Sequence, residues 1–199
     1  MRTENVVLMQ MARASLKGKW GLAIGVFVVY MLIAAAPGII PFVGPVASLI
    51  ISGPLALGFV IFSISISRNQ EAKLEQIFQG FSNFGTALGA YLLMLIFILL
   101  WTLLLIVPGI IAAISYSMTF YIIADDNSIA AKEAIDKSKK MMDGYKWKFF
   151  CLGLRFFGLA LLCVLTLGIG FLWLFPYIQV TVAKFYDDIK ANSLTAENS

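Results

Sequence analysis

Long apolar segments alternate with short charged segments along the whole chain. Uncharged breaks divide each apolar segment into two parts, and each part is close to the roughly 20 residues that a helix needs to cross a bilayer. The sequence therefore predicts six membrane spans, at about 20–36, 46–67, 85–107, 109–124, 147–166 and 170–186.

Turns without any charge separate the two spans of each consecutive pair. Three prolines lie between Pro37 and Pro45, and Pro108-Gly109 divides the third span from the fourth. The apolar run that starts near Trp147 has about 36 residues, too many for one span, and Thr166–Gly170 is its natural break. Without that break the chain would have five spans.

Pro54 lies near the middle of the second span. Proline costs about 3 kcal/mol inside a soluble helix. In a membrane bundle, however, neighbouring groups can bond the carbonyl that proline leaves free. We therefore expect a kink at Pro54 rather than the end of a helix.

Polar segments precede the first, third and fifth spans, and their apolar residues recur at helical spacing. In the first of them, Gln10, Arg13 and Lys17 share one face, with apolar residues elsewhere. This arrangement is typical of helices that lie in the membrane interface. It predicts amphipathic helices at about 5–17, 69–81 and 128–143.

The chain can be divided into three similar units. Each has an amphipathic segment, a glycine (Gly18, Gly80 or Gly144), an aromatic residue, a span, an uncharged turn and a returning span. Such repetition predicts one architecture used three times. We expect an all-α, polytopic transmembrane bundle of three helical hairpins, forming a single integral membrane domain over residues 1–199.

Two of the units carry a Gly-x-x-x-Gly pattern at the start of a span, Gly21 with Gly25 and Gly85 with Gly89. Small residues at this spacing let membrane helices approach closely. We expect these four glycines at helix contacts, although glycine is also common in membrane helices that lack such contacts.

Charge and composition place the chain in a membrane and orient it. Hydrophobic residues make up 60% of the chain and charged residues only 13%, far from the values of soluble domains. Charges gather before the first span, between the hairpins and towards the C-terminus, so six spans put both termini on one side. The positive-inside rule makes that side cytoplasmic.

Arg155 is the one ionisable residue that lies deep within a predicted span. It would lie about 10 Å below the interface, seven residues beyond Lys148. Charges inside membranes are often functional and face the bundle interior. A long side chain at this depth can also extend back to the headgroups, so both interpretations remain open.

A basic surface precedes the fifth span. Residues 132–148 contain six lysines and three acidic residues, a net charge of +3. Cations next to a membrane attract anionic headgroups. The candidate contacts with lipid headgroups or a protein partner are Lys139, Lys140, Lys146, Trp147 and Lys148.

The sequence shows no catalytic, cofactor-binding or metal-binding motif, and it contains no histidine. No nucleic-acid recognition motif accompanies the lysines. Hydroxyl-bearing residues do enrich the second and fourth spans, among them Ser63, Ser65, Ser115 and Ser117. Bonds between helices are the simpler explanation, and a polar pathway is the alternative.

Four groups of motifs lie along the chain: Lys17-Gly18-Lys19-Trp20, Pro108-Gly109-Ile110 with Tyr116, the run from Ala134 to Trp147, and Thr166–Gly170 followed by Trp173, Pro176-Tyr177 and Phe185-Tyr186. Together they resemble an uncharacterised family of bacterial integral membrane proteins, domain of unknown function 975. The resemblance covers nearly the whole chain. It implies a multi-pass plasma-membrane protein and supplies no ligand residues.

We therefore expect a non-enzymatic protein of the bacterial plasma membrane, with cytoplasmic termini and no cofactor. Its amphipathic helices would bind anionic lipid, a membrane-protein partner or a second copy of the chain, in envelope maintenance or as an accessory to transport. The alternative is a small transporter or channel, with a polar path between spans two and four near Arg155.

Overall fold

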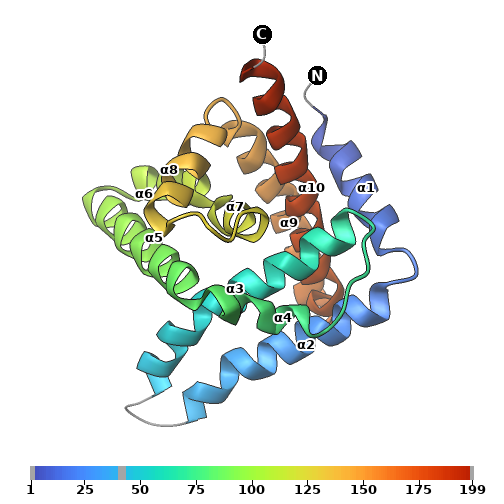
Figure 1. The fold of residues 1–199 in the computed structure, drawn as a ribbon. Helices are drawn as coiled ribbons and strands as arrows, with labels where there is room; N and C mark the ends of the chain where they lie inside the picture. Colours follow the sequence, from blue (N-terminus) through green and yellow to red (C-terminus); the bar gives the residue numbers. More distant parts are fainter. Residues whose placement is uncertain (1–2, 40–43, 198–199) are drawn as a thin grey trace.

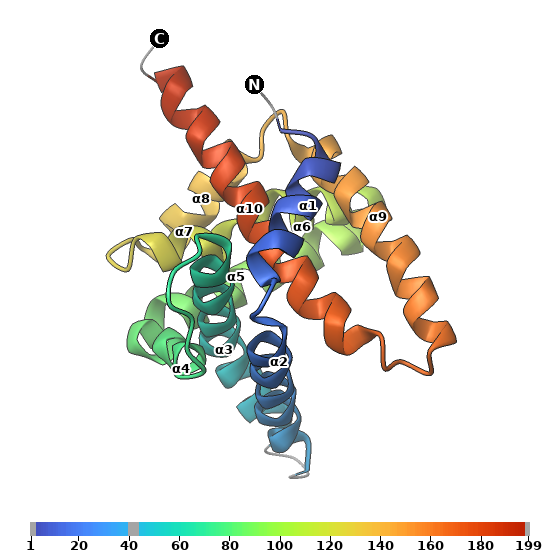
Figure 2. The same ribbon diagram turned by 90° about the vertical axis from the view of Figure 1, so that its right-hand side faces the viewer.

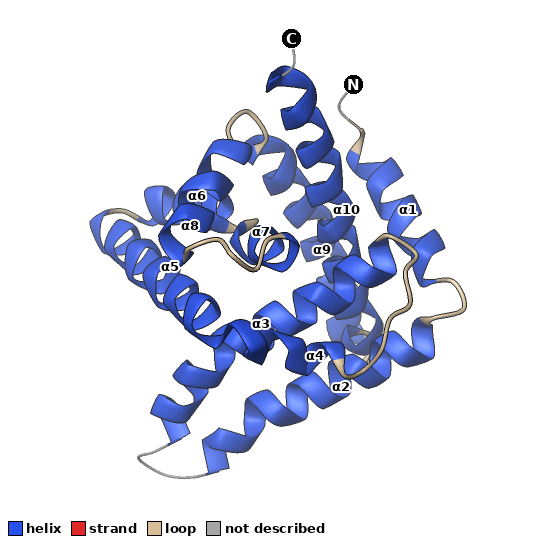
Figure 3. Ribbon diagram, in the orientation of Figure 1, coloured by secondary structure: helices blue, strands red, loops and turns tan. Residues whose placement is uncertain are grey.

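The computed structural model describes residues 3–39 and 44–197, and these residues form helices with no strand among them (Figures 1 and 3). Part of the predicted turn between Pro37 and Pro45 lies outside the described residues. The elements are α1 (Asn5–Leu16), α2 (Trp20–Ala35), η1 (Ala36–Ile39), α3 (Gly44–Ser67), α4 (Gln76–Gln79), η2 (Gly80–Asn83), α5 (Phe84–Leu104), α6 (Ile106–Tyr116), α7 (Thr119–Asp125), α8 (Ala131–Met141), α9 (Lys146–Leu165) and α10 (Phe171–Glu197).

Five stretches of the described helices are long and apolar enough to cross a membrane. They are Trp20–Gly38, Gly44–Ser67, Gln76–Leu104, Ile106–Asp125 and Lys146–Leu165. The all-α prediction is confirmed, and helix length and composition indicate a multi-pass membrane protein. The sixth predicted span, 170–186, falls within α10, which continues to Glu197 as a more polar helix and is not among the five.

The buried core lies towards one end of the long helices. In α5 the buried residues are Ala87 and Ala90, near the start, and in α9 they are Leu152 and Phe156. The far ends are exposed, as shown by Leu103 (85% exposed) in α5 and Leu165 (80% exposed) in α9. Figure 2 shows that the outer end of α2 and the α9–α10 connection lie away from the start of α1 and the end of α10, and away from each other. The apolar surface that the chain leaves uncovered is therefore at the outer ends of the helices.

The amphipathic helix predicted at 69–81 is largely absent. Helix α3 ends at Ser67, Asn69 has a positive φ of 57°, and the chain is helical again only over Gln76–Gln79 and the following 3₁₀ turn. The Gln76 side chain accepts a hydrogen bond from the Lys73 backbone N–H at 3.3 Å and donates one to Ser65 Oγ at 3.0 Å. These bonds hold the segment as a loop packed against α3.

The turn expected at Pro108-Gly109 falls a few residues earlier. The extended residue is Leu105, with φ −161° and ψ 142°, and Pro108 lies in the first turn of α6. Proline is tolerated there because the first N–H groups of a helix have no partner within it. The predicted fourth span is also divided into α6 and α7, with the break at Ser117 and Met118.

Helix α3 continues through Pro54, as expected, and the ribbon changes direction near its middle (Figure 1). The break predicted between the last two helices is also present. Leu167 and Gly168 have positive φ values of 53° and 86°, and the Thr166 hydroxyl accepts a hydrogen bond from the Gly170 N–H at 3.0 Å.

The closest approaches between helices do not involve the glycines that the Gly-x-x-x-Gly pattern selects. A Cβ added to Gly21, Gly25 or Gly85 would have no neighbour within 4 Å, and one at Gly89 would lie 3.4 Å from Ala131 Cβ. A Cβ at Gly58 would instead lie 1.8 Å from the Ile77 carbonyl oxygen. The spacing pattern does not reveal this contact, because Ile77 lies in the short helix α4 and outside the six predicted spans.

Replacing Gly58 with alanine is expected to lower stability by about 3 kcal/mol, because the loop and α4 must move away from α3. The measurement is the midpoint of thermal unfolding of the purified protein in detergent. Gly21→Ala is the matched control, since it adds the same methyl group with no neighbour within 4 Å and alanine favours helix. Equal midpoints for the two variants would contradict the close contact at Gly58.

Candidate functional site

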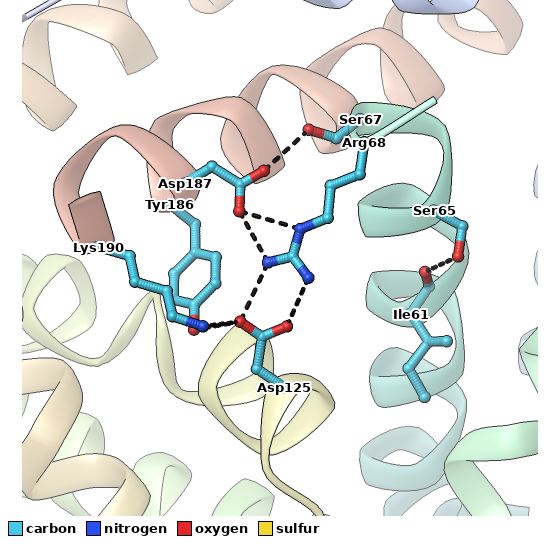
Figure 4. A network of polar contacts seen from close by, with 8 residues as sticks. All are labelled: Ile61, Ser65, Ser67, Arg68, Asp125, Tyr186, Asp187 and Lys190. Atoms are coloured by element: carbon cyan, nitrogen blue, oxygen red, sulfur yellow. Dashed lines mark hydrogen bonds and ion pairs between the residues drawn. The ribbon is translucent and has the colours of Figure 1, made fainter. Parts of the chain in front are cut away.

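A cluster of charged side chains joins the ends of α3 and α7 to α10 (Figure 4). We call it the charged cluster; its members are Ser67, Arg68, Asp125, Tyr186, Asp187 and Lys190. Each helix contributes residues at the point where its apolar stretch gives way to polar sequence. The cluster therefore forms where three segments leave the apolar core.

Arg68 is the centre of the cluster. Its guanidinium donates to both oxygens of Asp125, at 2.8 and 3.0 Å, and to Asp187 Oδ1 from Nε and Nη2, at 3.2 and 2.8 Å. Such forked contacts match the planar geometry of arginine and are among the stronger protein hydrogen bonds. The hydrogen bonds to Asp125 raise the pKa of Arg68, against the opposing effect of burial.

Asp125 is the most enclosed acid of the cluster, with its side chain 13% exposed. Besides Arg68 it accepts a hydrogen bond from the Tyr186 hydroxyl at 3.0 Å and an ion pair from Lys190. An enclosed carboxylate is costly unless it is paired and hydrogen-bonded. These three partners satisfy that requirement, and they connect α7 to the end of α3 and to α10.

A separate ion pair, outside the charged cluster, ties α9 to α10. Lys148 Nζ lies 2.8 Å from Asp188 Oδ2, with the two side chains 16% and 10% exposed. The Asn5 side-chain amide donates to the Lys148 carbonyl oxygen at 2.8 Å, and the Thr3 hydroxyl donates to Asp188. The start of the chain is thus attached to the same region.

Ser138 bridges the break between α6 and α7. Its hydroxyl donates to the Ser115 carbonyl oxygen at 2.8 Å and accepts from the Met118 N–H at 3.2 Å. All three residues are buried. The side chain comes from the apolar face of α8, so α8 replaces the helical hydrogen bonding that the break removes.

The basic surface predicted before α9 is divided by the structure. Lys139 and Lys140 are exposed on α8, and Trp147 is 74% exposed. Lys146 lies 4.0 Å from Asp143, whereas Lys148 is enclosed by its ion pair with Asp188. Lysines that are adjacent in sequence therefore differ in whether they can meet an external ligand.

Arg155 lies on the exposed side of α9. It lines a hollow of about 440 Å³ together with Gln10 and Arg13 of α1. Helix α1, which was predicted to lie in the membrane interface, therefore lies beside Arg155, the one charge predicted deep within a span.

The hydroxyl groups of the predicted second and fourth spans mostly bond to their own helices. Ser63 donates to the Phe59 carbonyl oxygen at 2.7 Å, and Ser115 to that of Ile111 at 2.7 Å. Ser117 donates to the Ile114 carbonyl oxygen at 2.8 Å. These bonds leave fewer hydroxyl hydrogens for a polar path between α3 and α6.

Two of the three repeated glycines have the same conformation. Gly18 and Gly144 have positive φ values, 80° and 74°, which turn the chain between an amphipathic helix and the next apolar helix. Gly80 has a φ of −61° and lies against the Pro54 carbonyl oxygen, where a Cβ would be 2.0 Å away. The first and third units are therefore locally alike, and the second differs.

Sequence reasoning missed the charged cluster. The sequence does show that Arg68, Asp125 and Asp187 lie at the ends of apolar segments. This position indicates that the three residues lie on the same side of a membrane, but it does not indicate that they pair. Among residues 3–39 and 44–197, no group of three or more histidine, cysteine or acidic residues could hold a metal ion. The charged side chains of the cluster are paired with one another and join helices.

Comparison with protein families identifies the chain. A family model described as a protein of unknown function, DUF975, matches residues 1–115 and 102–193. The chain belongs to this family. Neither the curated proteins nor the solved structures gave a match. The DUF975 assignment agrees with the resemblance seen in the sequence motifs and carries no activity with it.

Removing the negative charge of Asp125 is expected to destabilise this DUF975 protein. Asp125→Asn leaves Arg68 and Lys190 without their shared carboxylate, and hydrogen bonds to charged groups are worth about 2 kcal/mol. Thermal unfolding in detergent measures the loss. Glu71→Gln is the control, because its ion pair with Lys73 is between exposed side chains and is worth under about 1 kcal/mol. A similar shift in both variants would count against the cluster as a tie between helices.

Ser138→Ala is expected to cost about 1–3 kcal/mol, since it leaves the Met118 N–H and the Ser115 carbonyl oxygen unbonded in the core. Ser117→Ala removes a hydroxyl that bonds only within its own segment and should change the unfolding midpoint little. Hydrogen exchange of the Met118 amide provides a local readout. Unchanged protection of that amide in Ser138→Ala would refute the bridge.

Proposed function

We propose that this DUF975 protein is a non-enzymatic, multi-pass membrane protein that associates with anionic lipid headgroups through α8 and the start of α9. The observation that carries this proposal is the two-sided character of α8. Its buried residues, Ala134, Ile135 and Ser138, face the protein, while Lys139 and Lys140 are exposed and form no ion pair within the described residues.

Location supports the same function. Trp147 is the exposed aromatic residue at the start of α9. A turn at Gly144 connects it to the lysines at the end of α8. Amphipathic aromatic rings favour the headgroup level of a membrane, and each nearby cation adds about 1 kcal/mol of attraction to an anionic surface. We place this surface and both termini on the cytoplasmic side of a bacterial plasma membrane.

The alternative function, a transporter or channel with a polar path near Arg155, has less support. Arg155 faces α1 rather than the space between α3 and α7, and the serines of that region bond within their helices. A hollow of about 230 Å³ beside Tyr121 and Gln179 is the one observation in its favour. Flux through proteoliposomes above that of empty liposomes would support transport.

Quenching of tryptophan fluorescence by lipids with brominated acyl chains tests the lipid proposal. In mixed nanodiscs, brominated phosphatidylglycerol is expected to quench Trp147 more strongly than brominated phosphatidylcholine. The difference between wild type and Trp147→Phe isolates the signal of this residue. Lys139→Gln combined with Lys140→Gln should remove at least half of the excess quenching by the anionic lipid.

Lys73→Gln is the control for charge, because Lys73 is exposed but already paired with Glu71 at 3.1 Å. It should leave the preference for phosphatidylglycerol unchanged. Equal quenching of Trp147 by the two lipids in the wild-type protein would refute the proposed association.

A further inference from the structure

An open groove runs between α1 and the facing sides of α9 and α10. Its volume is about 560 Å³. Helix α9 contributes Leu159, Leu162 and Cys163, and α10 contributes Trp173, Leu174 and Tyr177. The walls are therefore almost entirely apolar and aromatic, as in sites that hold hydrocarbon.

The groove follows one continuous face of each helix. On α9, Arg155, Leu159, Leu162 and Thr166 recur at intervals of four, three and four residues, which places them on one side of a helix. Arg155 lies at the end nearer the start of α9, and Thr166 lies at the connection to α10. The charged residue thus marks one end of an apolar face.

Cations of α1 lie beside the groove, and one of them lies beside Arg155. Arg13 of α1 lines the groove and also two adjoining hollows of about 440 and 450 Å³. Arg155 shares the first of these hollows with Arg13, and Lys17 shares the second. No acidic residue of the described chain lines any of the three. Arg13 and Arg155 are exposed and make no ion pair among residues 3–39 and 44–197.

The stretch of chain from Arg155 to Thr166 is long enough to accompany an acyl chain. Eleven residues separate Arg155 from Thr166, a rise of about 16 Å along a helix. Half of the hydrocarbon thickness of a bilayer is about 15 Å. A headgroup held at the two arginines would therefore allow an acyl chain to follow the groove to the connection between α9 and α10.

We infer that this groove binds one anionic glycerophospholipid. Arg13 and Arg155 contact the phosphate, for which the guanidinium fork is well suited, and Leu159, Leu162 and Trp173 contact an acyl chain. The inference rests on the proposed association with anionic lipid, but it places a specific site at residues outside the α8 surface. It also gives Arg155 a role that needs no path through the protein.

Native mass spectrometry of the full chain in detergent tests the inference. The protein is titrated with phosphatidylglycerol or with phosphatidylcholine of the same acyl chains. One phosphatidylglycerol is expected to bind at low concentration. Arg13→Gln combined with Arg155→Gln should weaken its binding about thirtyfold, the effect of losing two cations of about 1 kcal/mol each.

Two matched variants separate charge from shape. Arg155→Lys combined with Arg13→Lys retains the positive charges and should retain most of the binding. Leu162→Trp places a larger side chain in the groove at a position that is 59% exposed, so it should weaken lipid binding without unfolding the protein. Unchanged unfolding midpoints verify that each variant is folded.

Four outcomes would overturn the inference. The first two are equal binding of the two lipids, and unchanged phosphatidylglycerol binding after removal of both arginines. The third is competition by soluble glycerol 3-phosphate as effective as that by the lipid. The fourth is a dimer whose abundance the groove variants change while the amount of bound lipid stays the same. The last would indicate a second copy of the chain in the groove.

The α8 variant separates this site from the broader proposal. Lys139→Gln combined with Lys140→Gln should leave the single tightly bound lipid in place while reducing the quenching of Trp147. If only that variant affects lipid, the groove inference fails and the proposed function stands. If only the arginine variant does, the lipid site stands and the α8 surface does not.

Discussion

The pairing of Arg68 with Asp125 and Asp187 is the interaction on which the arrangement of the helices most depends. Arg68 follows α3, Asp125 ends α7 and Asp187 lies in α10, so one guanidinium joins three segments. Lys190 and Tyr186 complete the coordination of Asp125. Because an enclosed charge without partners is strongly unfavourable, the three segments are held in one relative position.

The ion pairs and the buried core lie at one end of the molecule, so the other end is left with exposed apolar surface. The outer parts of α5, α6 and α9 keep large apolar side chains uncovered, such as Leu103 and Leu165. In water this surface would promote aggregation, whereas in a bilayer lipid chains cover it without loss. The groove between α1, α9 and α10 also lies outside the tied core, and it is there that we propose a bound lipid.

The three-unit pattern in the sequence corresponds to local structure in two units. Gly18 and Gly144 both adopt positive φ between an amphipathic and an apolar helix. In the second unit, Gly80 instead allows a close approach to Pro54, and the segment before it is a loop held by Gln76. Similar sequence patterns therefore serve different purposes, and the difference arises because the second polar segment packs against α3.

By itself, the sequence determined that this is an all-α protein with several apolar helices, and it located most of their ends to within a few residues. Hydropathy, proline and glycine act on nearby residues, so these features can be read along the chain. Only the tertiary structure decided which charges pair, which glycines are crowded and what Arg155 faces. Arg68 lies 57 residues from Asp125 and 119 from Asp187, and no local pattern specifies a contact across such distances. The pairing depends on how the helices pack.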